Sequence, residues 1–146
     1  MLALAAMMVA STSSAFLGAL NQAPRARPRH ATPAMAAPKT VKLGLVGGGT
    51  VGGGIVEILS RKAQFVETLG VKVEIARVVV GNVDKKRDWA VPAGCEITAD
   101  PNAVLNDPDI DIVVEVMGGT TLAKEVVTKA IKAGKHVVTA NKALIA

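Results

Sequence analysis

The chain has 146 residues, enough for one ordinary domain, and half of them are hydrophobic although only 2% are aromatic. A core built from Val, Ile, Leu and Ala is typical of buried parallel strands packed under helices. The net charge is +5, but all twelve acids and thirteen of the seventeen cations lie in residues 41–146. This part is therefore nearly neutral, and with few aromatic side chains to stack on bases we expect no nucleic-acid partner. One cysteine, Cys95, and two isolated histidines predict neither a disulfide nor a metal site.

Residues 1–40 have the composition of a targeting leader. The first twenty are small and apolar, like a signal-peptide core, and too short and serine-rich to span a membrane. The following stretch is rich in Pro, Arg and Ala and has no acid, as in a transit peptide. We therefore expect residues 1–40 to lie outside the fold, with no membrane segment in the mature protein.

The two parts in tandem resemble the bipartite plastid-targeting leaders of algae whose plastids lie inside extra membranes. In such leaders the signal peptide is cut just before a phenylalanine, which here is Phe16 in "SSAF". The absence of an early Lys or Arg departs from that pattern. The resemblance implies a plastid, and a simple mitochondrial or chloroplast leader is the alternative.

Strands and helices alternate after residue 40. "VKLGLVG" (41–47) predicts a buried strand, and apolar residues at helical spacing predict a helix over 51–69, which Gly70 ends. Alternation and β-branched residues over 71–81 predict a second strand, and "CEITAD" (95–100) predicts a short third one.

The second half of this region continues the alternation. A helical turn closed by Pro108 precedes an apolar strand over 110–117. The sequence then predicts a helix over 120–134, a strand over 135–140 and a helix starting in 141–146. The apolar face of the helix over 120–134 consists of Leu122, Val126, Val127, Ala130 and Ile131. Such alternation indicates the α/β class, a Rossmann-type parallel sheet with helices on both faces. The last helix stops at Ala146, so we expect a domain over 41–146 that is truncated at its C-terminus.

A glycine-rich loop joins the first strand to the first helix and fits a dinucleotide-binding fingerprint, G-x-G-x-x-G. In the register that best fits the strand end, Gly47 makes the tight turn and Gly49 lets the backbone approach a pyrophosphate. Gly52 lets the helix lie close to the strand, and free amides with the helix dipole hold the phosphates. We expect Gly53 and Gly54 to serve packing instead.

The end of the second strand bears on the choice between NAD and NADP. NAD-binding domains usually place an acid there to accept the ribose hydroxyls. This chain has Gly81 and Asn82 at that point, with Asp84 slightly beyond and the cations of 85–87 following. The pattern favours NADP and leaves NAD open. The alternative interpretation of the cations is that they belong to an ordinary solvated turn.

Three stretches, "GLVGGGTVGGGIVEIL", "DPDIDIVVEVMGG" and "AGKHVVTANKALIA", resemble the N-terminal NAD(P)-binding domain of homoserine dehydrogenase. The resemblance implies NAD(P)-dependent interconversion of L-homoserine and L-aspartate 4-semialdehyde, in the biosynthesis of threonine, methionine and isoleucine. It also implies cofactor-binding residues, which are Gly47, Gly49, Thr50, Val51 and Gly52 at the phosphates, Gly118 and Gly119 beside the cofactor, and Lys142 at the nicotinamide and substrate end. Glu115 is expected to be buried, either paired structurally or supporting the site. The family often has an arginine at the position of Gly81, which leaves the 2′-phosphate contact open.

In this family a second domain supplies the small-molecule substrate pocket, the dimer interface and the acid–base residues. The resemblance therefore implies that catalytic residues lie beyond Ala146, that a homodimer forms only with that domain, and that this chain alone does not turn over substrate. Two alternatives remain: another amino-acid or semialdehyde dehydrogenase sharing this half, or a non-catalytic dinucleotide sensor.

Overall fold

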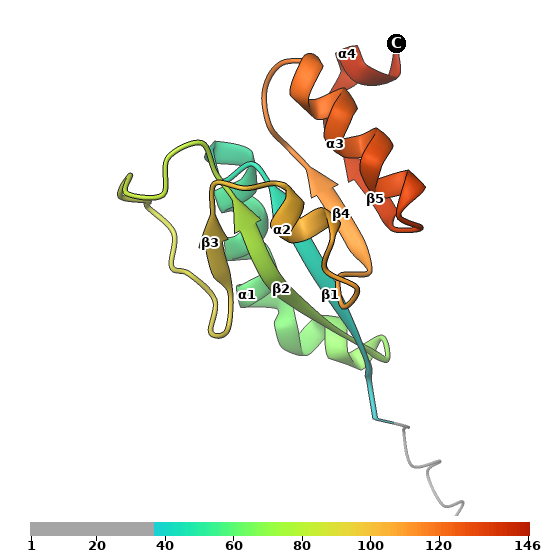
Figure 1. Cartoon of the computed structure of the whole chain (residues 1–146). Helices are drawn as coiled ribbons and strands as arrows, with labels where there is room; N and C mark the ends of the chain where they lie inside the picture. Colours follow the sequence, from blue (N-terminus) through green and yellow to red (C-terminus); the bar gives the residue numbers. More distant parts are fainter. Residues whose placement is uncertain (1–36) are drawn as a thin grey trace, which may run out of the picture. The chain divides into compact units, whose positions relative to one another are not determined.

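The computed structural model describes residues 37–146, which form a five-stranded parallel sheet with helices on both faces (Figure 1). The Rossmann-type α/β fold predicted from the sequence is confirmed. The strands are β1 (Lys39–Val46), β2 (Val71–Val79), β3 (Glu96–Thr98), β4 (Ile112–Glu115) and β5 (His136–Thr139). The helices are α1 (Thr50–Thr68), α2 (Asn102–Leu105), α3 (Thr121–Lys132) and α4 (Lys142–Ile145).

The strand order β3-β2-β1-β4-β5 determines where a ligand can bind. The chain moves outward from β1 to β3 and then returns to add β4 on the other side of β1. At such a switch point the connections leave β1 and β4 in opposite directions and open a crevice at the carboxyl ends of the strands.

The core has one apolar cluster on each face of the sheet. The cluster on the α1 face consists of Val56 from that helix and of Leu43, Leu45, Ile75, Val78, Val80 and Val114. The cluster on the other face consists of Val104 and Leu105 from α2, Val126 and Ala130 from α3, and Val46, Val79, Ile110 and Val113. A bulge in β2 determines which residues reach which face, because Leu43 pairs with Ile75 but Gly44 pairs with Arg77. The extra residue, Ala76, shifts the alternation so that Val78 and Val80 face α1.

The predicted apolar face of α3 is wrong at two positions. Leu122 and Ile131 are 50% and 60% exposed, whereas Ala123, Val126 and Ala130 are buried. The small alanines let the helix lie close to the sheet. Likewise, the fully buried residues of α1 are Gly52, Gly53 and Val56, whereas Val51, Ile58 and Phe65 are exposed. Ile55 and Leu59 of α1 are half-buried against the core, so small residues and one valine mark the most buried positions of each helix.

Each strand differs from its predicted bounds by one or two residues at one or both ends. β4 covers only 112–115 of the predicted 110–117. β1 begins at Lys39, which pairs with Val71, so it includes two residues assigned to the leader. Residues 37–38 of the predicted leader form no helix or strand, and residues 1–36 lie outside the described part of the chain.

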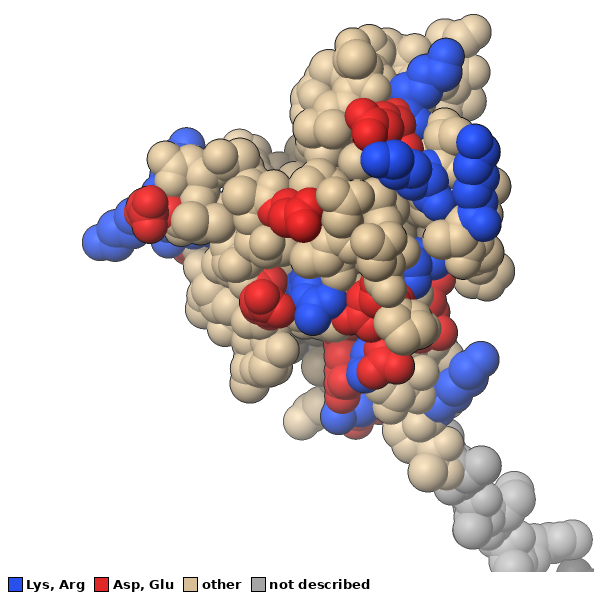
Figure 2. All heavy atoms as spheres, viewed as in Figure 1, with Lys and Arg blue, Asp and Glu red and all other residues tan. Residues whose placement is uncertain are grey.

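Within residues 37–146, no helix is long and apolar enough to cross a membrane, and no group of three or more His, Cys, Asp or Glu is placed to hold a metal ion. Burial raises the pKa of the Cys95 thiol, and the nearby Glu96 carboxylate adds to this, so the thiol stays protonated at neutral pH. Figure 2 shows cationic and acidic side chains interspersed on one face of the domain.

Candidate cofactor-binding site

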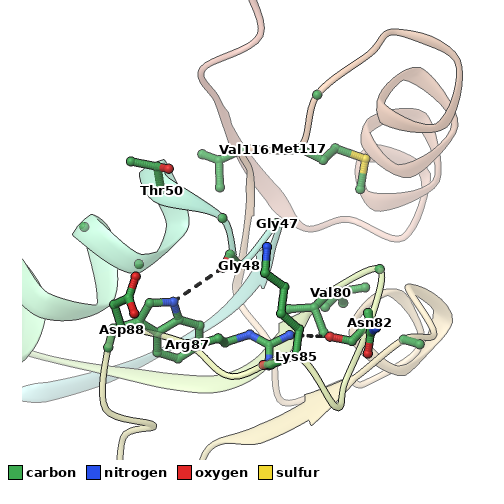
Figure 3. Close-up of a pocket in the computed structure, with 18 of the residues that line it drawn as sticks. Gly47, Gly48, Thr50, Val80, Asn82, Lys85, Arg87, Asp88, Val116 and Met117 are labelled. Atoms are coloured by element: carbon green, nitrogen blue, oxygen red, sulfur yellow. Dashed lines mark hydrogen bonds between the residues drawn. The ribbon is translucent and has the colours of Figure 1, made fainter.

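A cavity of about 770 Å³ lies at the carboxyl ends of β1, β2 and β4, the place that the strand order indicates. Three segments supply most of its lining, and Ala99, Pro101 and Leu122 complete it. The three segments are the glycine turn with the start of α1, the end of β2 with the loop after it, and residues 116–118 after β4. In Figure 3, Lys85, Arg87 and Asn82 lie below the glycine turn, with Val116 and Met117 above it. A dinucleotide that crosses the switch point would touch all three segments.

The glycine turn has its shape because two of its residues lack side chains. Gly47 has a φ of +116°, a region that L-residues with a side chain rarely adopt. A Cβ atom there would also lie 2.8 Å from the backbone of Val116. At Gly52, a Cβ atom would overlap the carbonyl oxygen of Gly47. These glycines therefore bring α1 onto the carboxyl end of β1, as the sequence predicted.

Gly49 differs from its neighbours because a Cβ atom there would have no protein atom within 4 Å. Its φ of −78° and ψ of −156° are open to any residue, so the fold does not require a glycine here. It lines the cavity. The open space beside Gly49 leaves room for a ligand to approach the backbone closely.

The first turn of α1 provides donors for an anion. The first hydrogen bond within the helix runs from Gly53 N to Gly49 O at 2.8 Å, so the amides of Thr50, Val51 and Gly52 have no acceptor in the helix. No side chain caps this end, and the first turn contains no acidic residue. The amides and the positive end of the helix dipole fit a pyrophosphate.

A hydrogen-bonded network joins the ends of β4 and β5. The fully buried carboxylate of Glu115 accepts from Met117 N at 2.9 Å and from Thr139 Oγ1 at 2.5 Å. Thr139 Oγ1 in turn accepts from Asn141 N at 3.0 Å, and Asn141 Nδ2 donates to Gly119 O at 2.6 Å. Both carboxylate oxygens are thus satisfied. Glu115 is buried and paired structurally, and its partners connect the loop after β4, which lines the cavity, to the loop after β5.

The residues predicted from the sequence occupy different places. Gly47, Gly49, Thr50 and Gly118 line the cavity. Four others do not line it: Gly52 is buried beneath the turn, Val51 is 55% exposed, Gly119 (φ +80°) is bonded to Asn141, and Lys142 is the first residue of α4. Ligand contacts by Val51, Gly52, Gly119 and Lys142 remain predictions from the family resemblance.

Two residues beside the cavity were not identified from the sequence. Gly48 lies against Val80, whose Cγ1 would be 2.6 Å from a Cβ atom at that position. Trp89 packs over Gly48 and Gly53 and lines the cavity. The one sequence feature that could have drawn attention to Trp89 is that it is the only tryptophan in a chain with few aromatic residues.

Residues 47–146 match the family model described as homoserine dehydrogenase, NAD binding domain. The chain belongs to the homoserine dehydrogenase family. Its cavity is accordingly that of an NAD-binding domain, and the donors and glycines described above fit this assignment.

Known members of the family agree over the same region. The homoserine dehydrogenase of Pseudomonas aeruginosa is 49% identical over 109 residues, which are 74% of this chain and 24% of that protein. The enzyme of Methylobacillus glycogenes is 48% identical over 110 residues, 74% of this chain and 26% of that protein. The crystal structure of the Thiobacillus denitrificans enzyme superposes with a TM-score of 0.68 at 44% identity, covering 75% of this chain and 25% of that one. The chain thus spans about a quarter of the length of these relatives.

Alanine substitutions distinguish a glycine that contacts ligand from one that contacts protein. Gly49→Ala should cost less than about 1 kcal/mol of unfolding free energy, the cost of a poorer N-cap. It should weaken binding of both NADPH and NADH about tenfold, or about 1.4 kcal/mol, because the methyl group meets the phosphates. Gly52→Ala should cost about 1–3 kcal/mol of unfolding free energy through overlap with the turn. Urea unfolding and calorimetric titration measure both quantities, and unchanged dinucleotide affinity in Gly49→Ala would contradict this assignment.

The network around Glu115 can be tested at Thr139. Thr139→Val removes the hydroxyl group that bridges Glu115 and Asn141, and should cost about 1–3 kcal/mol of unfolding free energy by leaving polar groups without partners. Thr139→Ser keeps the hydroxyl group and is the matched control, expected to retain most of the stability. Equal unfolding midpoints for the Val and Ser variants would show that the network contributes nothing.

Proposed function

We propose that this chain binds the nicotinamide cofactor of a homoserine dehydrogenase, which interconverts L-homoserine and L-aspartate 4-semialdehyde in threonine, methionine and isoleucine biosynthesis. The observation that carries the proposal is the glycine turn, which presents free amides to a cavity at the switch point of the sheet. The high identity to homoserine dehydrogenases over this domain supports the choice of reaction.

The chain's own residues would hold and orient the cofactor. Amides at the start of α1 would bind the pyrophosphate, and Gly118 would border the cofactor without steric bulk. The network around Glu115 would fix the loop that carries Lys142, the residue proposed for the nicotinamide end. When bound, the nicotinamide supplies the hydride chemistry, and the acid–base residues of the reaction are not assigned among these residues. The small-molecule substrate, the homodimer and the lack of a nucleic-acid partner stay predictions.

Direct titration tests the proposal. We expect the chain to bind NADPH or NADH with a stoichiometry of one, measured by calorimetry, and to show no binding of flavin mononucleotide at the same concentrations. The flavin carries a phosphate but only half of a dinucleotide, so it controls for simple anion binding. Absence of binding for both nicotinamide dinucleotides would contradict the proposed function.

We also propose that residues 1–40 direct the protein to a plastid through a signal-like part followed by a transit-like part. The composition of the two parts and Phe16 at their junction support this. In an alga whose plastid lies inside extra membranes, a fluorescent protein fused to residues 1–40 should enter the plastid. A fusion to residues 21–40 alone is the control and should stay outside it. Mitochondrial fluorescence of the longer fusion would overturn the proposal in favour of a simple leader.

A further inference from the structure

The loop between β2 and β3 forms one side of the cavity, although residues 80–95 contain no helix or strand. Lys85, Lys86 and Arg87 all line the cavity from this loop. Two acids, Glu57 and Asp88, line it as well, so the cations exceed the acids by one among these residues. A loop without regular structure needs specific contacts to hold its charges in place.

Trp89 supplies such a contact. Its indole ring packs on the glycine turn itself, because a Cβ atom at Gly53 would overlap the ring and one at Gly48 would lie 3.3 Å from Cζ2. The indole Nε1 also donates to Gly48 O at 3.4 Å, the dashed line that ends at Gly48 in Figure 3. Because Gly48 and Gly53 have no side chains, the indole ring can pack directly on their backbone. Contact with Trp89 is thus a third reason for glycines in this segment.

Arg87 is held in turn by Trp89 and by the loop backbone. Its Cζ atom lies 5.9 Å from the centre of the indole ring, within the range of a cation–π interaction. Its guanidinium donates to Asn82 O at 2.6 Å, to Lys85 O at 2.7 Å and to Val83 O at 3.3 Å. A guanidinium has five N–H donors, so two remain for an anion. Arg87 is therefore fixed beside the cavity with donors to spare.

The neighbouring strand end indicates which anion would be bound. β2 leads into Gly81 and Asn82, both of which line the cavity, and this tip has no carboxylate to accept the ribose hydroxyls of NAD. A 2′-phosphate on the adenosine ribose would bring negative charge to this place, where Arg87 and the two lysines lie. The geometry thus favours the phosphorylated dinucleotide.

We propose that Trp89 is a positioning residue for cofactor selectivity. By packing on Gly48 and Gly53, it holds Arg87 where the 2′-phosphate of NADP would bind. The inference rests on the proposed function, since it requires that the cavity takes a dinucleotide. Trp89 makes no contact with the phosphate and acts through Arg87. The β2–β3 loop and the glycine turn are then parts of one site, coupled through the indole ring.

Calorimetric titration of the chain with NADPH and NADH tests this, with the ratio of the two Kd values as the readout. We expect the wild-type chain to prefer NADPH, and Trp89→Ala to weaken NADPH about tenfold while NADH changes less than about twofold. Trp89→Phe keeps an aromatic ring on the two glycines and should retain most of the preference. Arg87→Gln should lose the preference to a similar degree, and the double variant should lose no more than either single one.

Lys129→Gln is the charge control, because Lys129 is an exposed cation on α3 whose partner Glu125, at 2.7 Å, also lies outside the cavity. It should leave the ratio unchanged. Arg87 is outside both core clusters, so Arg87→Gln remains informative if Trp89→Ala fails to fold. Equal losses of NADPH and NADH affinity in Trp89→Ala, or a wild-type chain without preference, would overturn the inference. A chain that binds neither dinucleotide would contradict the proposed function itself.

Discussion

The close approach of α1 to the carboxyl end of β1 is the constraint on which the site depends. It requires a left-handed residue at Gly47 and the absence of a side chain at Gly52, where a Cβ atom would overlap the Gly47 carbonyl oxygen. Because the helix begins directly at the turn, its uncapped first turn starts at the cavity, which Gly49 and Thr50 line. The packing of Gly47 and Gly52 thus places the free amides where an anion could bind.

The remaining walls of the cavity are held by two separate sets of contacts. On one side, Trp89 packs on the glycine turn and anchors the cationic loop after β2. On the other, the buried Glu115 connects the ends of β4 and β5 through Thr139 and Asn141. Since loops at the ends of parallel strands have no ladder to hold them, such side-chain contacts determine their conformation. The switch point positions the cavity, and these contacts shape it.

Much of the architecture was predictable because it is encoded locally. The order of strands and helices follows from the periodicity of apolar residues, and the handedness of βαβ units then leaves few sheet topologies. The roles of Gly47 and Gly52 were also predictable, since a fingerprint between a strand and a helix constrains each glycine separately. Even the short α2 turn and its end before Pro108 could be identified from composition.

What the sequence did not reveal depends on register between distant segments. The bulge at Ala76 moves Val78 and Val80 to the α1 face, and nothing in the local alternation marks it. The most buried positions of α1 and α3 are mainly glycines and alanines, so a search for large apolar residues also selects exposed ones such as Ile58 and Ile131. The contact of Trp89 with Gly48 and Gly53 joins residues some forty positions apart, and only the folded chain brings them together.

We expect the amides at the start of α1 to hold the pyrophosphate of a nicotinamide dinucleotide. Amide resonances of the chain, followed by heteronuclear NMR during titration with NADPH, test this most directly. We expect the largest shifts at the amides of 48–52, with smaller ones in the loop after β2 and at Gly118. Shifts confined to other parts of the domain, or no shifts at saturating NADPH, would contradict it.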